Sequence, residues 1–401
     1  MIPTWNFHSA GQLIFGWGAR KRLGYLAQLA GRRKVLLVSD PNLVRVGMVD
    51  EIAGLLNNAG MTVDIFDQSE AEPSLMVAEA AAAQAREFRP DAILGLGGGS
   101  NIDLAKMTAV LSTYGGDPRQ YFGWDQVPGP VTPLVALPTT AGTGSEVSQS
   151  SVLTDTEANL KVSMLSNFLR PTLALVDPEL TVSCPKQVTA DSGIDALTHA
   201  VEGFLARDYT ELEIARDATT PYAGSNPLVD TFAEQAIRLV GNYLTRAVED
   251  GSDREAREQM ALAATLGGLA FSNGGVAVVH ALEYPIGGAV HCSHGAGNGL
   301  LLPYVMRYNL AVRRDKIARI GHWLNPALLA ASTDEAAEGA IEAVEQLKLR
   351  IGIPAKLSAW GVTEEMIPQL AAKSFGITRL MTMNPRTPSE ADLREILKAA
   401  L

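Results

Sequence analysis

One carboxylate and three imidazoles in the second half of the chain are the side chains best suited to metal chemistry. Asp195 and His199 stand four residues apart in DSGIDALTHAVEGF, and His280 and His294 follow in VVHALEYPIGGAVHCSHGAGN. Residues four apart on a helix project from one face, so Asp195 and His199 can point at the same ion. One anionic oxygen and three nitrogens suit Fe(II), Zn(II) or a similar transition metal better than Ca²⁺ or Mg²⁺. We interpret the set as a catalytic metal site that acts as a Lewis acid on an oxygen.

The alternative interpretation is a pair of surface residues joined by a hydrogen bond, since Asp and His at this spacing often form one. The two other histidines favour the metal. His280 follows the apolar run GGVAVV, where burying a histidine without a partner is costly. His294 lies in the glycine-rich segment HCSHGAGNG, which allows close approach of the backbone.

The overall composition excludes several classes of function. The chain has 401 residues, of which 47% are hydrophobic and 19% charged, which predicts a globular protein long enough for two domains. A net charge of −11 argues against a nucleic-acid partner. Two cysteines, Cys184 and Cys292, indicate no disulfide framework and fit a reducing cytoplasm. The N-terminus lacks the pattern of a signal peptide. The sequence also contains no run of about 18 apolar residues, the length that predicts a membrane span.

Strand and helix signals alternate in the first half of the chain. Strands are expected at 34–40, 62–67, 91–100 and 134–140, with helices at 49–60 and 76–88. This alternation predicts an α/β N-terminal domain over residues 1–180, built on a parallel, Rossmann-like sheet. Ligands of such sheets bind at the carboxyl ends of the strands.

The second half carries helical periodicity instead. Apolar residues recur with a period of about 3.6 in four long segments after residue 180, which predicts an all-helical domain over residues 181–401. Residues 207–227 interrupt this pattern with Pro, Gly, Ser and Asn, which indicates a long loop or insertion between two helices.

Two glycine-rich segments and one aspartate suggest a nucleotide. Gly97–Ser100 join an apolar strand to a helix, an arrangement that suits a pyrophosphate, although a glycine-rich turn without a ligand has the same appearance. A second segment of small residues, PTTAGTGSE at 138–146, ends the next strand. Asp40 ends the first strand, where it could accept the ribose hydroxyls of NAD or simply cap a helix.

The motifs GGGSNIDLAK, PTTAGTGSEV, DSGIDALTHAVE and HALEYPIGG, with SHGAGNGLLLPYVMRYN, resemble the iron-containing (group III) alcohol dehydrogenases. The resemblance covers nearly the whole chain. It implies a nucleotide-binding domain, a helical domain and a cleft between them. The expected cofactors are NAD and Fe(II), with Zn(II) as an alternative, and the expected substrates are small alcohols or hydroxyacids with their aldehydes or oxoacids. A homo-oligomer, dimer or larger, is expected as well.

The resemblance also implies roles for individual residues. It assigns the metal to the same aspartate and three histidines. The nucleotide is expected at Asp40, Gly98, Gly99, Ser100, Asp103, Thr139, Thr140, Thr143 and Lys161. Asp103 and Lys106 match a family motif and would either touch the cofactor or brace the loop. Phe271 matches a position that lines the substrate pocket beside the nicotinamide.

The chain departs from the family pattern at its proton path. Many members carry a histidine four residues after the third ligand, where this chain has Tyr284. The ordinary tyrosine pKa of about 10 makes it a poor base near neutrality. His291 is the rival candidate for the relay, or else a hydrogen-bond partner of the site. His8 and His322 have no motif context and are expected to be structural or surface residues.

Residues 207–227 and Tyr284 also resemble the hydroxyacid–oxoacid transhydrogenase branch, which holds its nicotinamide tightly. Arg207 and Arg216 are the cations of the insertion that could orient an acid group on the substrate. A lyase related to dehydroquinate synthase would need several basic residues near the metal, and the chain around His280 has none. A non-catalytic binding protein is disfavoured because all four metal ligands and both glycine loops are retained.

Overall fold

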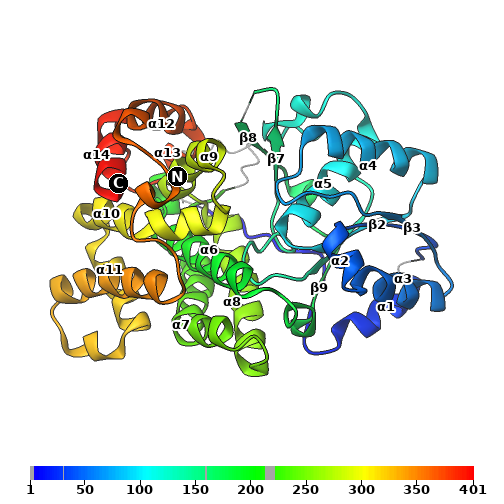
Figure 1. The fold of residues 1–401 in the computed structure, drawn as a ribbon, viewed down its shortest axis with the longest axis horizontal. Coiled ribbons are helices and arrows are strands. Elements are labelled where there is room, and N and C mark those ends of the chain that lie inside the picture. Colours follow the sequence, from blue (N-terminus) through cyan, green and yellow to red (C-terminus); the bar gives the residue numbers. More distant parts are fainter. Residues whose placement is uncertain (1–3, 30, 159, 213–221) are drawn as a thin grey trace.

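The structure is a computed structural model that describes residues 4–29, 31–158, 160–212 and 222–401. Figure 1 shows the chain as two halves lying side by side. Strands and their covering helices form one half, in blue and cyan, and helices coloured from green to red form the other. The functional site is built where these halves meet.

A six-stranded parallel sheet forms the centre of the first half. Its strands lie in the order β1-β9-β6-β4-β2-β3, and every paired neighbour is parallel. Their bounds are β1 Leu13–Phe15, β9 Leu173–Val176, β6 Leu134–Pro138, β4 Ala92–Gly97, β2 Lys34–Val38 and β3 Thr62–Phe66. The predicted parallel α/β sheet is therefore confirmed, and all the strands end at the same edge.

The alternation of side chains along β2 explains why the sheet carries helices on both faces. Val35 and Leu37 pack into one apolar cluster, whereas Leu36 and Val38 pack into another on the opposite face. The helices of these layers are α1 (Leu23–Leu29) and α3 (Met48–Asn58) on the first face, and α4 (Leu75–Phe88) and α5 (Gly99–Tyr114) on the second. A short helix, α2 (Pro41–Arg45), follows β2 at the edge where the strands end.

A second, smaller sheet was not anticipated from the sequence. β7 (Ser150–Asp155) and β8 (Leu160–Leu165) form an antiparallel hairpin, and β5 (Gly123–Trp124) pairs with β8. Alternate residues of β7 are buried. Two of the three buried positions, Ser151 and Asp155, are polar, so the alternation does not appear as a hydrophobic pattern. In Figure 1 this hairpin lies between the two halves.

The second half consists of helices, as predicted. Its members are α6 (Lys186–Leu205), α7 (Pro227–Glu249), α8 (Arg254–Gly274), α9 (Val278–Val290), α10 (His294–Leu324), α11 (Thr333–Arg350), α12 (Ile367–Phe375), α13 (Thr378–Met383) and α14 (Glu390–Ala400). Within the described ranges, the last strand ends at Val176. The exact domain boundary at residue 180 stays a prediction.

Helices α8 and α9 form a buried, sharply bent pair. The chain turns by 106° between them. This bend brings Phe271, near the end of α8, and His280, near the start of α9, to the same part of the molecule. Over the described parts of the chain, no single helix is long and apolar enough to cross a membrane. Taken together, α8 and α9 have sufficient length and apolar composition, but the bend separates them.

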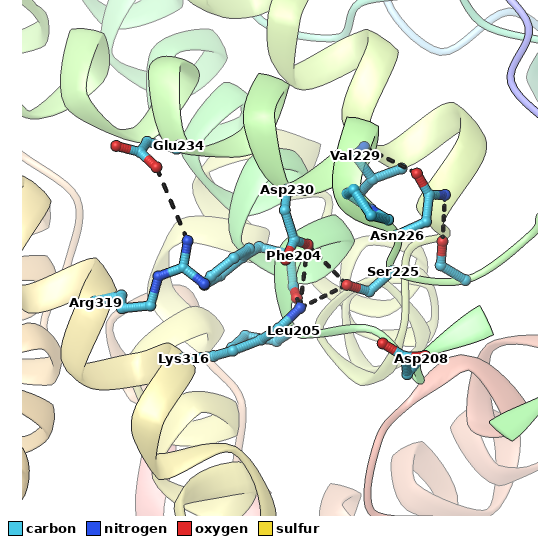
Figure 2. A network of polar contacts seen from close by, with 12 residues as sticks. Phe204, Leu205, Asp208, Ser225, Asn226, Val229, Asp230, Glu234, Lys316 and Arg319 are labelled. Carbon is cyan, nitrogen blue, oxygen red and sulfur yellow. Dashed lines mark hydrogen bonds and ion pairs between the residues drawn. The ribbon is translucent and has the colours of Figure 1, made fainter. Parts of the chain in front are cut away.

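The two ends of the 207–227 insertion are held together. The Ser225 amide donates to the Arg207 carbonyl over 2.9 Å, and the Tyr209 amide donates to the Ser225 carbonyl over 3.0 Å. Figure 2 shows Lys316 of α10 joining this point to α6 and α7, with Nζ 2.6 Å from Ser225 Oγ and 3.1 Å from an Asp230 oxygen. The segment joins α6 to α7, which agrees with the predicted connection between two helices, and residues 213–221 lie outside the described residues.

Candidate functional site

A cavity of about 500 Å³ lies where the carboxyl ends of the strands face the helical half. Both halves contribute to its wall. The sequence-predicted residues that line it are Asp40, Gly98, Gly99, Ser100, Asp103, Thr140, Thr143, Lys161, Asp195, His199, Phe271, His280, Tyr284 and His294. The fold therefore brings the expected metal ligands and most of the expected nucleotide residues into one cavity.

Three helices converge to assemble the candidate metal centre. Asp195 of α6, His280 of α9 and His294 at the start of α10 offer ligand atoms that all lie within 4.8 Å of one another. His199 lies beside this group, with its Nε2 3.1 Å from His280 Nε2. The approach of α10 to α6 requires Gly295, because an added Cβ there would lie 2.1 Å from the Asp191 carbonyl oxygen.

Two of the four predicted donors are in protonation states that suit metal binding. Burial lowers the pKa of His199 to about 4, so its ring is neutral at physiological pH. The pKa of Asp195 lies below its usual value, because attraction by the three histidines outweighs the effect of burial. A metal ligand must be deprotonated, and His199 and Asp195 already favour that form. For His294, burial lowers the pKa, but the attraction of Glu283 outweighs it and raises the pKa, so an ion would displace a proton from this ring.

The polar atoms at this point also fit an ion. The Asn298 amide nitrogen lies 2.8 Å from Asp195 Oδ1 and 3.2 Å from Nε2 of both His280 and His294. The buried Nδ1 atom of His199 lies 3.8 Å from Asp195 Oδ2. Acceptor atoms from three helices therefore converge on a small buried volume, and their nitrogen and oxygen chemistry fits Fe(II) or Zn(II).

Two buried glutamates orient the histidines, and neither is among the residues predicted from the sequence. A Glu202 oxygen lies 2.5 Å from Nδ1 of His280 and another accepts from the Val279 amide over 2.7 Å. Glu283 contacts Nδ1 of His294 in the same way. Each contact leaves Nε2 of the ring facing the centre and raises its basicity as a ligand.

The sequence contains a signal for these glutamates. Each stands three residues after a predicted ligand, in HAVE and HALE. The structure exchanges the partners, however: Glu202 follows His199 but contacts His280, and Glu283 follows His280 but contacts His294. Only the packing of α6, α9 and α10 determines this exchange.

Lys161 connects the β7–β8 hairpin to the metal centre. Its Nζ lies 2.8 Å from a Glu72 oxygen and 3.5 Å from a Glu283 oxygen. Burial alone would lower the pKa of Lys161, but the two carboxylates outweigh burial and hold the pKa above its usual value. Lys161 is therefore a charged link between the loop after β3, the hairpin and α9, and its predicted contact with the nucleotide stays a proposal.

The two glycine loops lie against each other at the edge of the sheet. Gly98 forms the N-cap of α5. A Cβ at Gly99 would lie 2.6 Å from the Thr143 side chain, so only glycine allows the second loop to approach this closely. Thr139 does not line the cavity: it is buried, and its amide donates to the Gly97 carbonyl over 2.9 Å.

Asp40 performs the capping role and also faces the cavity. Its Oδ1 accepts from the amides of Asn42 and Leu43 at the start of α2, over 2.8 and 3.2 Å. Its Oδ2 accepts from the Asn101 side chain over 2.7 Å. The two interpretations of this residue are therefore compatible, because a carboxylate can accept several hydrogen bonds at once.

Lys106 stabilises the loop between β6 and β7. Its side chain is fully buried, and Nζ lies 2.7–3.2 Å from five oxygen atoms of Ser145, Ser148 and Ser150. Asp103 accepts from Ser145 Oγ over 2.6 Å and from the Val152 amide over 2.8 Å. Asp103 lines the cavity and Lys106 does not.

Phe271 and Tyr284 flank the metal centre. The Phe271 ring stacks on His199, with centroids 4.2 Å apart. The Tyr284 ring centroid lies 5.9 Å from that of His294 and 6.5 Å from that of His280. Both aromatic residues line the cavity beside the donors, which is the placement expected for groups that contact a substrate.

Besides Thr139, two further predicted site residues are placed away from the cavity. His291 ends α9 in a left-handed conformation, is exposed and does not line the cavity, so its position does not support a relay role. Arg207 is directed to the C-terminal segment, where it donates to Thr387 Oγ1 over 2.7 Å. Arg216 lies outside the described residues. His8 and His322 are also absent from the cavity wall, as expected of structural residues.

Comparison with known proteins agrees with this site. Residues 10–178 match the family described as iron-containing alcohol dehydrogenase, and residues 189–401 match the C-terminal part of the Fe-containing alcohol dehydrogenase family. The chain belongs to the iron-containing alcohol dehydrogenase family.

Relatives and solved structures match over almost the whole length of the chain. An NAD-dependent methanol dehydrogenase of Bacillus methanolicus is 36% identical, over 99% of this chain and 100% of that protein. A 1,3-propanediol dehydrogenase of Klebsiella pneumoniae is 37% identical, over 100% of this chain and 98% of the relative. A crystal structure of a 1,3-propanediol oxidoreductase has a TM-score of 0.92 at 37% identity, covering 99% of this chain and 100% of that one.

Proposed function

We propose that this member of the family is an NAD-linked oxidoreductase that interconverts a small primary alcohol or hydroxyacid with its aldehyde or oxoacid. The observation that carries the proposal is the convergence of two features in one cavity. Asp195, His280 and His294 offer metal ligands, and the glycine loop at Gly98 and Gly99 offers a pyrophosphate site at a helix N-terminus. The relative described as an NAD-dependent methanol dehydrogenase supports the choice of NAD.

Each residue of the site has a physical task in this proposal. A divalent iron held by these donors supplies Lewis-acid polarisation of a substrate oxygen, and NAD supplies the hydride acceptor. Glu202 and Glu283 hold the rings of His280 and His294 in the orientation and tautomer that a ligand needs. Phe271, stacked on His199, supplies an apolar wall that excludes water beside the reacting carbon.

The proposal is tested by measuring NAD reduction with a panel of short alcohols and hydroxyacids, on protein whose metal content has been assayed. We expect turnover that scales with the fraction of protein carrying iron. Absence of NAD reduction with every substrate, on protein shown to be metal-loaded, would contradict it.

The transhydrogenase alternative makes a different prediction in the same experiment. Such an enzyme retains its nicotinamide through purification and couples a hydroxyacid to an oxoacid without added NAD. A cofactor peak in the denatured protein and turnover without added NAD would favour that alternative. A cytoplasmic location and a homo-oligomeric assembly stay predictions.

Replacing Asp40 is expected to change the choice of nucleotide. The carboxylate lines the cavity and would repel the 2′-phosphate of NADP. Asp40→Ser retains a side-chain oxygen that can cap α2, whereas Asp40→Gly also removes the cap. We expect kcat/KM with NADP to rise about tenfold or more in both variants. Equal use of the two nucleotides by the unmodified protein would contradict this assignment.

Replacing Tyr284 separates a role in proton transfer from a role in packing. Burial raises the pKa of Tyr284, so its hydroxyl stays protonated at neutral pH and can only donate or relay a proton. Tyr284→Phe retains the ring and is expected to lower kcat by about tenfold or more with unchanged metal content. His291→Asn, which suits the left-handed backbone, tests the rival path. An active Phe variant would show that Tyr284 only fills the cavity.

A further inference from the structure

Arg379 provides a positive charge in the cavity that the proposed reaction does not use. It belongs to α13, which packs against α9, and it lines the cavity together with Tyr222, Tyr284 and Leu380. Arg379 is not among the residues predicted from the sequence, because it lies far along the chain from every motif.

The hydrogen-bonding capacity of Arg379 is largely unused. Its Nη2 donates to Ser163 Oγ on β8, and its Nε is buried without a hydrogen-bond partner. In the part of the chain that the structure describes, no carboxylate lies within ion-pair distance of this guanidinium. An arginine has five N–H donors in a fork that matches a carboxylate, and it remains charged when half-buried.

Arg379 differs in this respect from Lys161, the other lysine or arginine among the residues that line the cavity. Lys161 is neutralised by Glu72 and Glu283. A partly desolvated cation without a counter-charge is costly, and an anionic ligand would remove that cost.

Tyr284 relates Arg379 to the metal centre. The Tyr284 ring centroid lies 5.9 Å from that of His294, and Tyr284 and Arg379 line the same cavity. The metal donors and Arg379 therefore face one cavity, with Tyr284 also in its wall. A short molecule with an oxygen at the metal centre and an acid group at its other end would interact with both the metal centre and Arg379.

We infer that Arg379 binds an anionic group on the substrate, so that the cavity selects short ω-hydroxycarboxylates and the corresponding oxoacids over neutral alcohols. This inference rests on the proposed function and names its substrate class. A phosphate of the nucleotide offers similar chemistry to a guanidinium, and the experiment separates these two sources of negative charge.

The test compares 4-hydroxybutyrate with 1,4-butanediol, which has the same number of carbons and no charge. Arg379→Gln is expected to raise KM for 4-hydroxybutyrate about 10- to 100-fold, the range of a hydrogen bond to a charged group. KM for 1,4-butanediol and for NAD should change less than about twofold, by the same reasoning. Arg379→Lys should recover part of the loss. Arg307→Gln is the matched control, because Arg307 is an exposed arginine paired with Glu338 and does not line the cavity.

A binding measurement makes the test independent of turnover. Calorimetric titration with butyrate, which lacks the reacting hydroxyl, should show weaker binding to Arg379→Gln by a similar factor. The inference is overturned if Arg379→Gln binds butyrate as tightly as the unmodified protein, or if it raises KM equally for 4-hydroxybutyrate and 1,4-butanediol. It is also overturned if KM for NAD rises instead, which would place a nucleotide phosphate at Arg379. A wild-type enzyme that oxidises 1,4-butanediol but not 4-hydroxybutyrate also overturns it and leaves the proposed function intact.

Discussion

His280→Ala is expected to remove the metal and nearly all activity. His280 lies at the middle of the donor set, with Nε2 3.1 Å from His199 Nε2, and its Nδ1 is held by Glu202. Loss of this ligand should lower bound iron to a small fraction of one ion per chain. Turnover should fall at least about 10³-fold, since a Lewis acid contributes several kcal/mol and each 1.4 kcal/mol is tenfold in rate. Elemental analysis of the purified variant measures the first effect, and NAD reduction measures the second.

Asp195→Asn is a companion variant that retains shape and removes the negative charge of the site. We expect it to lose metal as well, because Asp195 is the sole carboxylate among the predicted ligands. His322→Gln is the control: it removes an imidazole outside the cavity and should leave iron content unchanged. Full metal content and activity in His280→Ala would show that the ligand assignment is wrong.

Lys106→Met is expected to destabilise the protein strongly. The Lys106 side chain is fully buried, and its ammonium is the hydrogen-bond partner of the Ser145, Ser148 and Ser150 carbonyls. Methionine fills a similar volume but removes every hydrogen-bond contact that Nζ makes with the three serines. Removing one partner of such a network costs about 3–5 kcal/mol. At about 2–4 °C per kcal/mol for a unit of this size, the Tm should fall by roughly 6–20 °C in a thermal melt.

Burial lowers the pKa of Lys106 to about 8, so the ammonium is still charged at pH 7, where the melt should be measured. Lys398→Met controls for loss of a lysine, because Lys398 is exposed and makes an ion pair with Glu395. A melt of Lys106→Met that matches the control would mean that the loop does not depend on this lysine. If Lys106 instead contacted the cofactor, the variant would weaken NAD binding without lowering the Tm.

Local patterns in the sequence determined the secondary structure and the position of the metal donors along the chain. Alternating strands and helices predicted the parallel sheet, because their periodicities are properties of short segments. The same is true of the Asp195–His199 face, since four residues make about one turn of any helix. Glycines at 97–99 marked the end of a strand and the start of α5 because the helix N-terminus and the tight turn are local as well.

The tertiary structure decided which distant side chains meet. Glu202 and Glu283 each orient a histidine other than the one three residues before them, because helix packing rather than spacing sets the contact. The polar β7–β8 hairpin, which places Lys161 beside Glu283, has no hydrophobic alternation to reveal it. Arg379 reaches the cavity only because α13 packs against α9. His291, three residues from a ligand, turns away because the chain is left-handed where α9 ends. Proximity in sequence therefore located the metal donors, whereas the groups that orient them and face the substrate depend on contacts between segments far apart in the chain.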